Sequence, residues 1–192
     1  MFHRQYPTDV AGIVLVDAVP DDFSARMDSV PGVDAMVGDW SSGLRQSAWL
    51  ARLGVARLLH WCGTDSTPRE IAAVNNAIDC WPSQMRARLL DGSSFEEDLR
   101  SARAAGSFGD LPLVVVSRDP TRVDTDWGAL APILNPIWNS SQLDLLALSS
   151  HSSHMIALMS GHDIPFDRPD VIVDAIRKVI AVTNGVSKVQ RP

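Results

Sequence analysis

The stretch that decides the fold of this chain is Met155–Ile164, with the sequence MIALMSGHDI. It begins as a short apolar run typical of a buried strand, turns at Ser160 and Gly161, and reaches His162. Gly161 permits the tight turn, and a helix is expected to begin near Arg168. In open α/β sheets the loops after the strands carry the chemistry. The stretch therefore predicts an α/β fold with a histidine at the carboxyl edge of a parallel sheet.

Two further apolar runs are each followed by an acidic residue. Ile13–Val16 is followed directly by Asp17, and Leu113–Val116 is followed, after a short turn, by Asp119. Continuous apolar runs of this kind favour strands covered on both faces in a parallel sheet. Because parallel strands place their carboxyl ends at one edge, we expect both acids to lie near His162.

Between these two strands the sequence has no convincing strand and is typical of helices. Helical patterns cover Asp39–Trp61, Pro68–Asp79 and Pro82–Ala105, the last with a break near Gly92. The first of these helices carries Trp49 in a broad apolar surface. That surface either packs within the helical block or lines a pocket for an apolar substrate group.

Regular alternation of helix and strand returns after the second strand. We predict a helix from Pro132 or Pro136 to Leu148, a strand at Ser153–Met159, and a final helix capped by Asp167. The final helix has a predicted buried stripe, made by Ile172, Ile176, Val179 and Ile180. Helices between parallel strands imply right-handed crossovers.

The predicted fold class is α/β, with a partial parallel sheet of about three strands, flanking helices and a helical cap insertion. The chain divides into a core α/β segment at 1–19, a helical cap or lid at 20–109, a second core segment with the acid and the histidine at 110–183, and a flexible tail at 184–192.

His162 is the strongest candidate for a catalytic residue. An imidazole titrates near neutral pH, so it can take a proton from a nucleophile and return it to a leaving group. Such a base needs an acid that fixes its tautomer, and Asp119 and Asp17 are both candidates. We interpret His151 and His154 as non-catalytic.

The sequence contains no recognisable nucleophile. An exposed nucleophile needs a strand-to-helix elbow such as G-x-S-x-G, and Ser41–Gly43, Gly92–Ser94 and Ser160–Gly161 lack the flanking strand and the second glycine. There is no glycine-rich phosphate loop and no dinucleotide fingerprint, so we expect no cofactor. No histidines and acids have the spacing of a metal site, so we also expect no metal.

The composition argues against nucleic acid as a partner and against a membrane span in this chain. The formal net charge of −6 gives no basic footprint, which argues against nucleic acid. No apolar run reaches the ~18 residues of a membrane span, and no signal-peptide pattern is present, so we expect a cytoplasmic protein. Composition leaves the oligomeric state open.

Three segments resemble the α/β-hydrolase fold family. Tyr6–Ala18 is similar to the segment after the nucleophile helix of these enzymes, and Leu111–Val116 resembles their penultimate strand. Ser160–Ile176 closely resembles their histidine loop and last helix. The resemblance implies that the chain holds the last strands of such a sheet and that the helical block is the variable cap.

The resemblance also implies roles for individual residues. His162 corresponds to the base of a nucleophile-histidine-acid triad. The acid usually follows the penultimate strand, which favours Asp119, whereas haloalkane dehalogenases place it one strand earlier, which favours Asp17. The earlier strands, the oxyanion loop and the nucleophile elbow are expected before Met1, so the chain alone is expected to be inactive.

The complete enzyme is then expected to hydrolyse an ester-type or related bond in a small apolar or ester-like substrate. The alternative is a non-catalytic α/β module that binds an apolar ligand or a protein partner through its helical block.

Overall fold

The computed structural model describes residues 2–59, 74, 78, 81–122 and 125–189. The chain forms two compact units, one made of Met1–Ser29 with Leu99–Pro192 and the other of Val30–Asp98. The first unit contains all the strands of the described residues. The second is helical where it is described.

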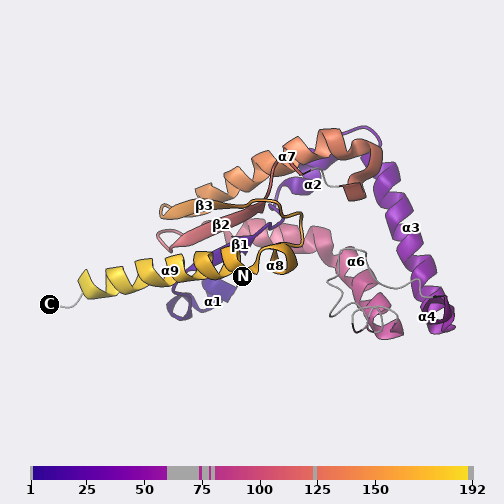
Figure 1. Cartoon of the computed structure of the whole chain (residues 1–192), viewed down its shortest axis with the longest axis horizontal. Coiled ribbons are helices and arrows are strands. Elements are labelled where there is room, and N and C mark those ends of the chain that lie inside the picture. The colour runs from indigo at the N-terminus through magenta and orange to yellow at the C-terminus, as the bar shows by residue number, and fades with distance from the viewer. Residues whose placement is uncertain (1, 60–73, 75–77, 79–80, 123–124, 190–192) are drawn as a thin grey trace. The chain divides into compact units, whose positions relative to one another are not determined.

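The first unit is built on a three-stranded parallel sheet in the order β1-β2-β3 (Figure 1). Its strands are β1 (Ile13–Val16), β2 (Leu113–Arg118) and β3 (Ser152–Ala157). β2 is central and buried along its whole length, whereas every residue of β1 is only half-buried. The predicted α/β fold with a parallel sheet of about three strands is therefore confirmed.

Helices cover both faces of this sheet (Figure 1). On one face, Val114 and Val116 pack in a core with residues of α9 (Pro169–Val189). On the other face, Leu113 and Val115 pack with Leu145 of the 3₁₀ helix η3 (Leu145–Leu148). The alternation follows from the period-two geometry of a strand, and it explains why β2 is apolar without interruption.

The remaining elements of the first unit are short except for α7. They are α1 (Phe2–Gln5), η1 (Pro7–Asp9), α2 (Phe23–Asp28), η2 (Thr125–Leu130), α7 (Ala131–Asp144) and α8 (Ile164–Asp167). The prediction that Asp167 caps the last helix is wrong, because Asp167 ends α8 and α9 begins at Pro169. Its carboxylate instead accepts hydrogen bonds from Gly161 N and Ser160 Oγ, so it fixes the loop before His162.

The second unit contains α3 (Val33–Arg52) and α4 (Val55–Leu58), and α6 (Pro82–Ala105) begins in it. The single helix predicted to reach Trp61 ends earlier, because Gly54 adopts a left-handed φ of 72°. The break predicted near Gly92 is absent, since an isolated glycine is tolerated in a helix at a cost of about 1 kcal/mol. The helix predicted at Pro68–Asp79 lies outside the described residues, apart from two positions.

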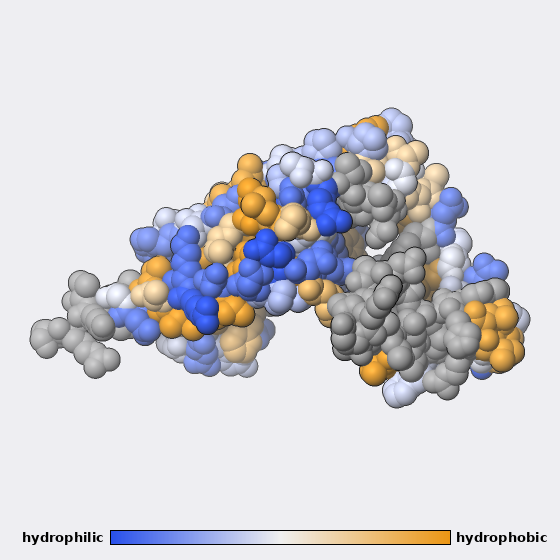
Figure 2. All heavy atoms as spheres, viewed as in Figure 1, coloured by the Kyte–Doolittle hydropathy of each residue, from blue (hydrophilic) through white to orange (hydrophobic). Residues whose placement is uncertain are grey.

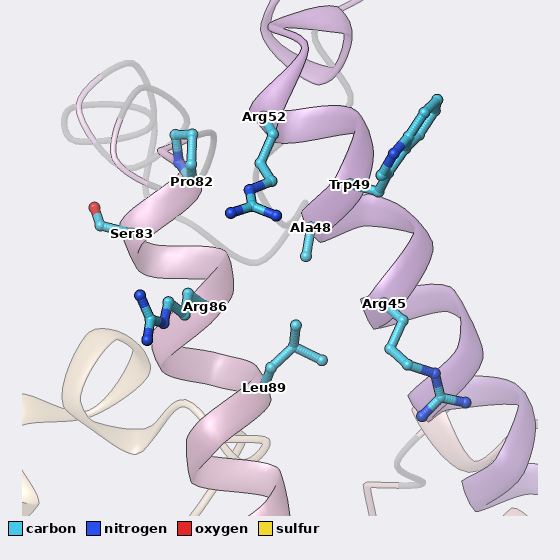
Figure 3. A pocket seen from close by; sticks show the side chains of 8 residues that line it. All are labelled: Arg45, Ala48, Trp49, Arg52, Pro82, Ser83, Arg86 and Leu89. Atoms are coloured by element: carbon cyan, nitrogen blue, oxygen red, sulfur yellow. The ribbon is translucent and has the colours of Figure 1, made fainter.

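A groove of about 530 Å³ lies between α3 and α6 within the second unit (Figure 3). Ala48 and Leu89 face each other across it, and the Arg52 side chain extends into the same space. Trp49 lies at the rim and is 59% exposed. Leu44 of the same helix packs against Ala51 and Met85 inside the helical block, whereas Trp49 is exposed among the described residues.

Apolar side chains also reach the surface of the first unit. In Figure 2, hydrophobic patches interrupt the hydrophilic surface around the strands and α9. On α9 these exposed residues include Val173, Ile176 and Ile180. Large exposed apolar surfaces on a soluble protein are commonly places where another segment or molecule packs.

Candidate active site

Three charged or titratable side chains meet where the strands end. Asp17 follows β1 directly, Arg118 is the last residue of β2, and His162 lies in the loop between β3 and α8. His162 Nδ1 lies 2.7 Å from Asp17 Oδ2, and Arg118 Nε donates to the same oxygen at 2.8 Å. Trp138 of α7 donates from Nε1 to the other oxygen, Oδ1, at 2.9 Å. Asp17 is thus the centre of a cluster built from four separate parts of the chain.

The backbone of Asp17 is in an uncommon conformation. Its φ of 41° lies in the left-handed region, which aspartate tolerates better than most residues. The surroundings hold it there, since Asp17 N donates to Val116 O at 2.7 Å and Gln142 Nε2 donates to Ala18 O at 2.9 Å. Strained residues held in this way cluster at functional sites, which makes the conformation a pointer to function.

The Asp17 side chain is buried and remains ionised. Burial alone raises its pKa, but the hydrogen bond from His162, the charge of Arg118 and the hydrogen bond from Trp138 together lower that pKa below its usual value. A carboxylate can only accept, so the shared proton of this contact is on Nδ1 of His162. The other ring nitrogen, Nε2, is then the basic atom of the neutral imidazole.

His162 combines a fixed orientation with an accessible ring. Its side chain is 60% exposed, and the ring stands edge-on to Trp138 at 6.1 Å between centroids. The hydrogen bond to Asp17 raises the pKa of His162, burial opposes this, and the Asp17 charge adds to the rise. Among the described residues no group forms a hydrogen bond with Nε2. An oriented imidazole with a free Nε2 is what a general base requires.

The structure does not bring Asp119 to His162. Asp119 Oδ1 accepts hydrogen bonds from Thr121 N at 2.9 Å and Thr121 Oγ1 at 2.6 Å, and Oδ2 accepts one from Met159 N at 2.8 Å. The Thr121 hydroxyl is the main cause of a lowered pKa of Asp119. Asp119 therefore ties the turn after β2 to the loop after β3, and of the two candidate acids Asp17 alone contacts the histidine.

Another histidine with a side-chain partner, His154, lies within the sheet. His154 Nε2 is 2.7 Å from Ser117 Oγ, and burial lowers the pKa of His154. No carboxylate of the described residues forms a hydrogen bond with it. This contact joins β2 to β3 and lacks the acid that orients a catalytic imidazole.

Sequence reasoning missed Arg118 and Trp138. The sequence did contain a signal for Arg118, which is a charged residue at the end of an apolar strand. A side chain at that position reaches the edge of the sheet where Asp17 lies. Trp138 carried no signal, because it is 121 residues from Asp17 and stands in an ordinary helical pattern. Tertiary packing alone made it a partner of the acid.

Neither a metal site nor a membrane segment is found in the described part of the chain. Within it, no group of three or more histidine, cysteine, aspartate or glutamate side chains is arranged to hold a metal ion. The helices described there are too short or too polar to cross a membrane.

No protein-family model matches this chain, and no curated protein or solved structure matches it either. The fold and the site therefore define its class: an α/β protein whose parallel sheet carries a buried aspartate, paired with an arginine and a partly exposed histidine.

Proposed function

We propose that this chain carries the acid and the base of an α/β-hydrolase-like enzyme that cleaves an ester-type or related bond through a nucleophile-histidine-acid triad. The observation that supports this most directly is the 2.7 Å contact between His162 Nδ1 and Asp17 Oδ2 beyond the ends of parallel strands. The likeness of Ser160–Ile176 to the histidine loop and last helix of that family adds to it.

The chemistry follows from the roles of the two side chains. His162 Nε2 takes the proton of the nucleophile as it attacks the carbonyl carbon, and Asp17 stabilises the imidazolium that forms. The imidazolium then protonates the leaving oxygen, and an alcohol departs from the acylated enzyme. Water attacks the acyl group with the same imidazole as base, which releases the acid and restores the enzyme.

In this proposal the nucleophile lies on a strand that pairs with the free edge of β1. Among the described strands, β1 pairs with β2 and its other edge has no partner. An unpaired apolar edge is a ready template for another strand. A strand added there in parallel ends at the same edge of the sheet as Asp17, and the segment 20–109 then corresponds to the cap.

The first test is the coding sequence upstream of the Met1 codon. We expect an in-frame G-x-S-x-G elbow about 20–30 residues before Met1. The extended product is expected to hydrolyse p-nitrophenyl butyrate, with a loss of at least about 10³-fold in His162→Ala. Asp17→Asn is expected to lose about 10⁴-fold in kcat, whereas Asp119→Asn stays within about tenfold.

Two results would contradict the proposal. An upstream region without an elbow favours the non-catalytic α/β module instead. Ester hydrolysis by the 192-residue chain itself, abolished by His162→Ala, places the nucleophile among these residues and overturns the part of the proposal that puts it elsewhere.

A further inference from the structure

We propose that Arg118 is a third charged member of this site, a positioning residue whose positive charge, held against Asp17, opposes protonation of the His162 imidazole before a nucleophile delivers a proton to it. This inference rests on the proposed function for its meaning in catalysis. The underlying interaction is a property of the folded chain and is testable without a reaction.

The geometry places the charge where it acts on both partners. Arg118 Nε donates to Asp17 Oδ2 at 2.8 Å, and His162 Nδ1 shares that same oxygen at 2.7 Å. The side chains of Arg118 and Asp17 are only 3% and 0% exposed, so water screens their charges little. The guanidinium and the imidazole therefore compete for one carboxylate oxygen.

Two indole rings hold the guanidinium in place. Arg118 Cζ lies 4.6 Å from the centroid of the Trp138 ring and 5.5 Å from that of Trp127. A planar guanidinium can stack on indoles and donate in the plane to a carboxylate at once, which a lysine ammonium cannot do equally well. The stacking fixes the position of the positive charge beside Asp17.

Asp17 has two further contacts that do not involve the guanidinium. Its Oδ1 accepts from Trp138 Nε1 at 2.9 Å and faces the backbone N of residue 118 at 3.4 Å. Both groups remain when the Arg118 side chain is changed. The contact of Asp17 with His162 is thus expected to survive a neutral substitution at position 118, so the loss of charge can be measured separately.

The charged groups around His162 act in opposite directions. Asp17 after β1 favours the imidazolium through its hydrogen bond and charge, Asp163 in the same loop adds to this, and Arg118 at the end of β2 opposes it and lowers the pKa of His162. On α8, Asp167 accepts from Gly161 N, and α7 contributes the uncharged Trp138. Arg118 is the cation of this set, so its removal leaves an environment that favours the protonated ring.

The experiment is a pH titration of the His162 ring by NMR in the 192-residue chain, with the resonance assigned from His162→Gln. In Arg118→Gln the pKa of His162 is expected to rise by about half a unit or more. Arg118→Lys keeps the charge, so its shift is expected to be smaller than that of Arg118→Gln. The control is Arg177→Gln, which removes an exposed arginine of α9 and is expected to leave the pKa unchanged.

A purely structural role predicts the opposite sign. If Arg118 only holds the fold, its loss frees His162 from Asp17 and the pKa falls towards about 6.5, which overturns the proposal. If Arg118→Gln does not fold, a second comparison tests the proposal with a variant that lacks both charges of the ion pair. Removing both members of a buried ion pair is better tolerated than removing one. Between Asp17→Asn and Asp17→Asn/Arg118→Gln, the double variant is expected to have the higher pKa of His162, and an equal or lower value contradicts the proposal.

These outcomes are separate from those of the proposed function. A chain that lacks an upstream elbow can still show the expected titration, and a chain with an elbow can fail it. The first result contradicts the proposed hydrolase and supports the electrostatic role of Arg118. The second supports the proposed hydrolase and contradicts the role of Arg118.

Discussion

At the scale of single residues, Asp17 shows how a buried carboxylate stays ionised. Removal from water is costly for a charge, and three donors from Arg118, Trp138 and His162 replace the lost hydration. Asp119 has the same position in the sequence pattern, but its donors come from Thr121 and Met159. Both acids follow an apolar strand, so the sequence left both open, and the two differ in the partners that the fold brings to them.

This burial makes the stability of the fold depend on pH. The lowered pKa of Asp17 contributes stability that is present above its unfolded value of about 3.9 and is lost as the pH falls through the folded value. The raised pKa of His162 contributes stability below about 6.5 that is lost as the pH rises through the folded value. Stability from this pair is therefore greatest between these limits.

We expect Asp17→Asn to be less stable by roughly 3 kcal/mol at pH 6, because it removes one charge of the buried Asp17–Arg118 ion pair. Its stability is also expected to change less than that of the wild type between pH 6 and pH 3. Urea unfolding followed by circular dichroism at several pH values measures both effects. Asp28→Asn, an exposed change on α2, is the control, and a parallel pH profile in Asp17→Asn would refute the expectation.

At the scale of elements, α9 shows where periodicity misleads. Of the predicted buried stripe, Val179 is buried, but Ile176 and Ile180 are 45% and 53% exposed. Val171 and Ala175, which were not predicted, are buried in their place. These residues were expected inside because their spacing of i, i+4, i+7 and i+8 places them on one side of a helix. Smaller side chains face the sheet, because α9 lies too close to β1 for large ones to fit between them.

Gly12, just before β1, marks this close approach. A Cβ at this position would lie 2.3 Å from Val179 Cγ1 and 3.0 Å from Pro112 O. Gly12→Ala is therefore expected to destabilise the first unit by about 1–3 kcal/mol through overpacking.

The matched control is Gly185→Ala on α9, where an added Cβ meets nothing within 4 Å. It is expected to be neutral or to stabilise the helix by up to about 1 kcal/mol. Thermal unfolding of the two variants measures the difference. Equal melting temperatures would show that the space between α9 and Gly12 accommodates a methyl group.

At the scale of the whole molecule, the first unit has a sheet whose apolar surface is incompletely covered. A groove of about 620 Å³ runs along β1 and α9, with Val14, Ile176 and Ile180 among its lining residues. Among the described strands, one edge of β1 has no partner, and Val14 of this strand lines the groove. Apolar surface next to a free strand edge favours association with another segment or chain.

We expect the chain to bind the dye ANS and to associate as its concentration rises. Ile176→Lys/Ile180→Lys is expected to lower both signals by placing charges in the groove, as measured by ANS fluorescence and sedimentation velocity. Leu143→Lys, at an equally exposed apolar position on α7, is the control and is expected to change neither. Similar effects of both variants would mean that the groove is not the surface responsible.

The sequence by itself determined the strands, most of the helices and their order. Continuous apolar runs, glycine turns and helix periodicity are local signals, and they were sufficient to place Asp17, Asp119 and His162 after strands of a parallel sheet. Only the tertiary structure decided which acid contacts the histidine and which residues support it. Those contacts join residues 101, 121 and 145 positions apart, and their geometry depends on how helices pack on the sheet, which no local pattern encodes.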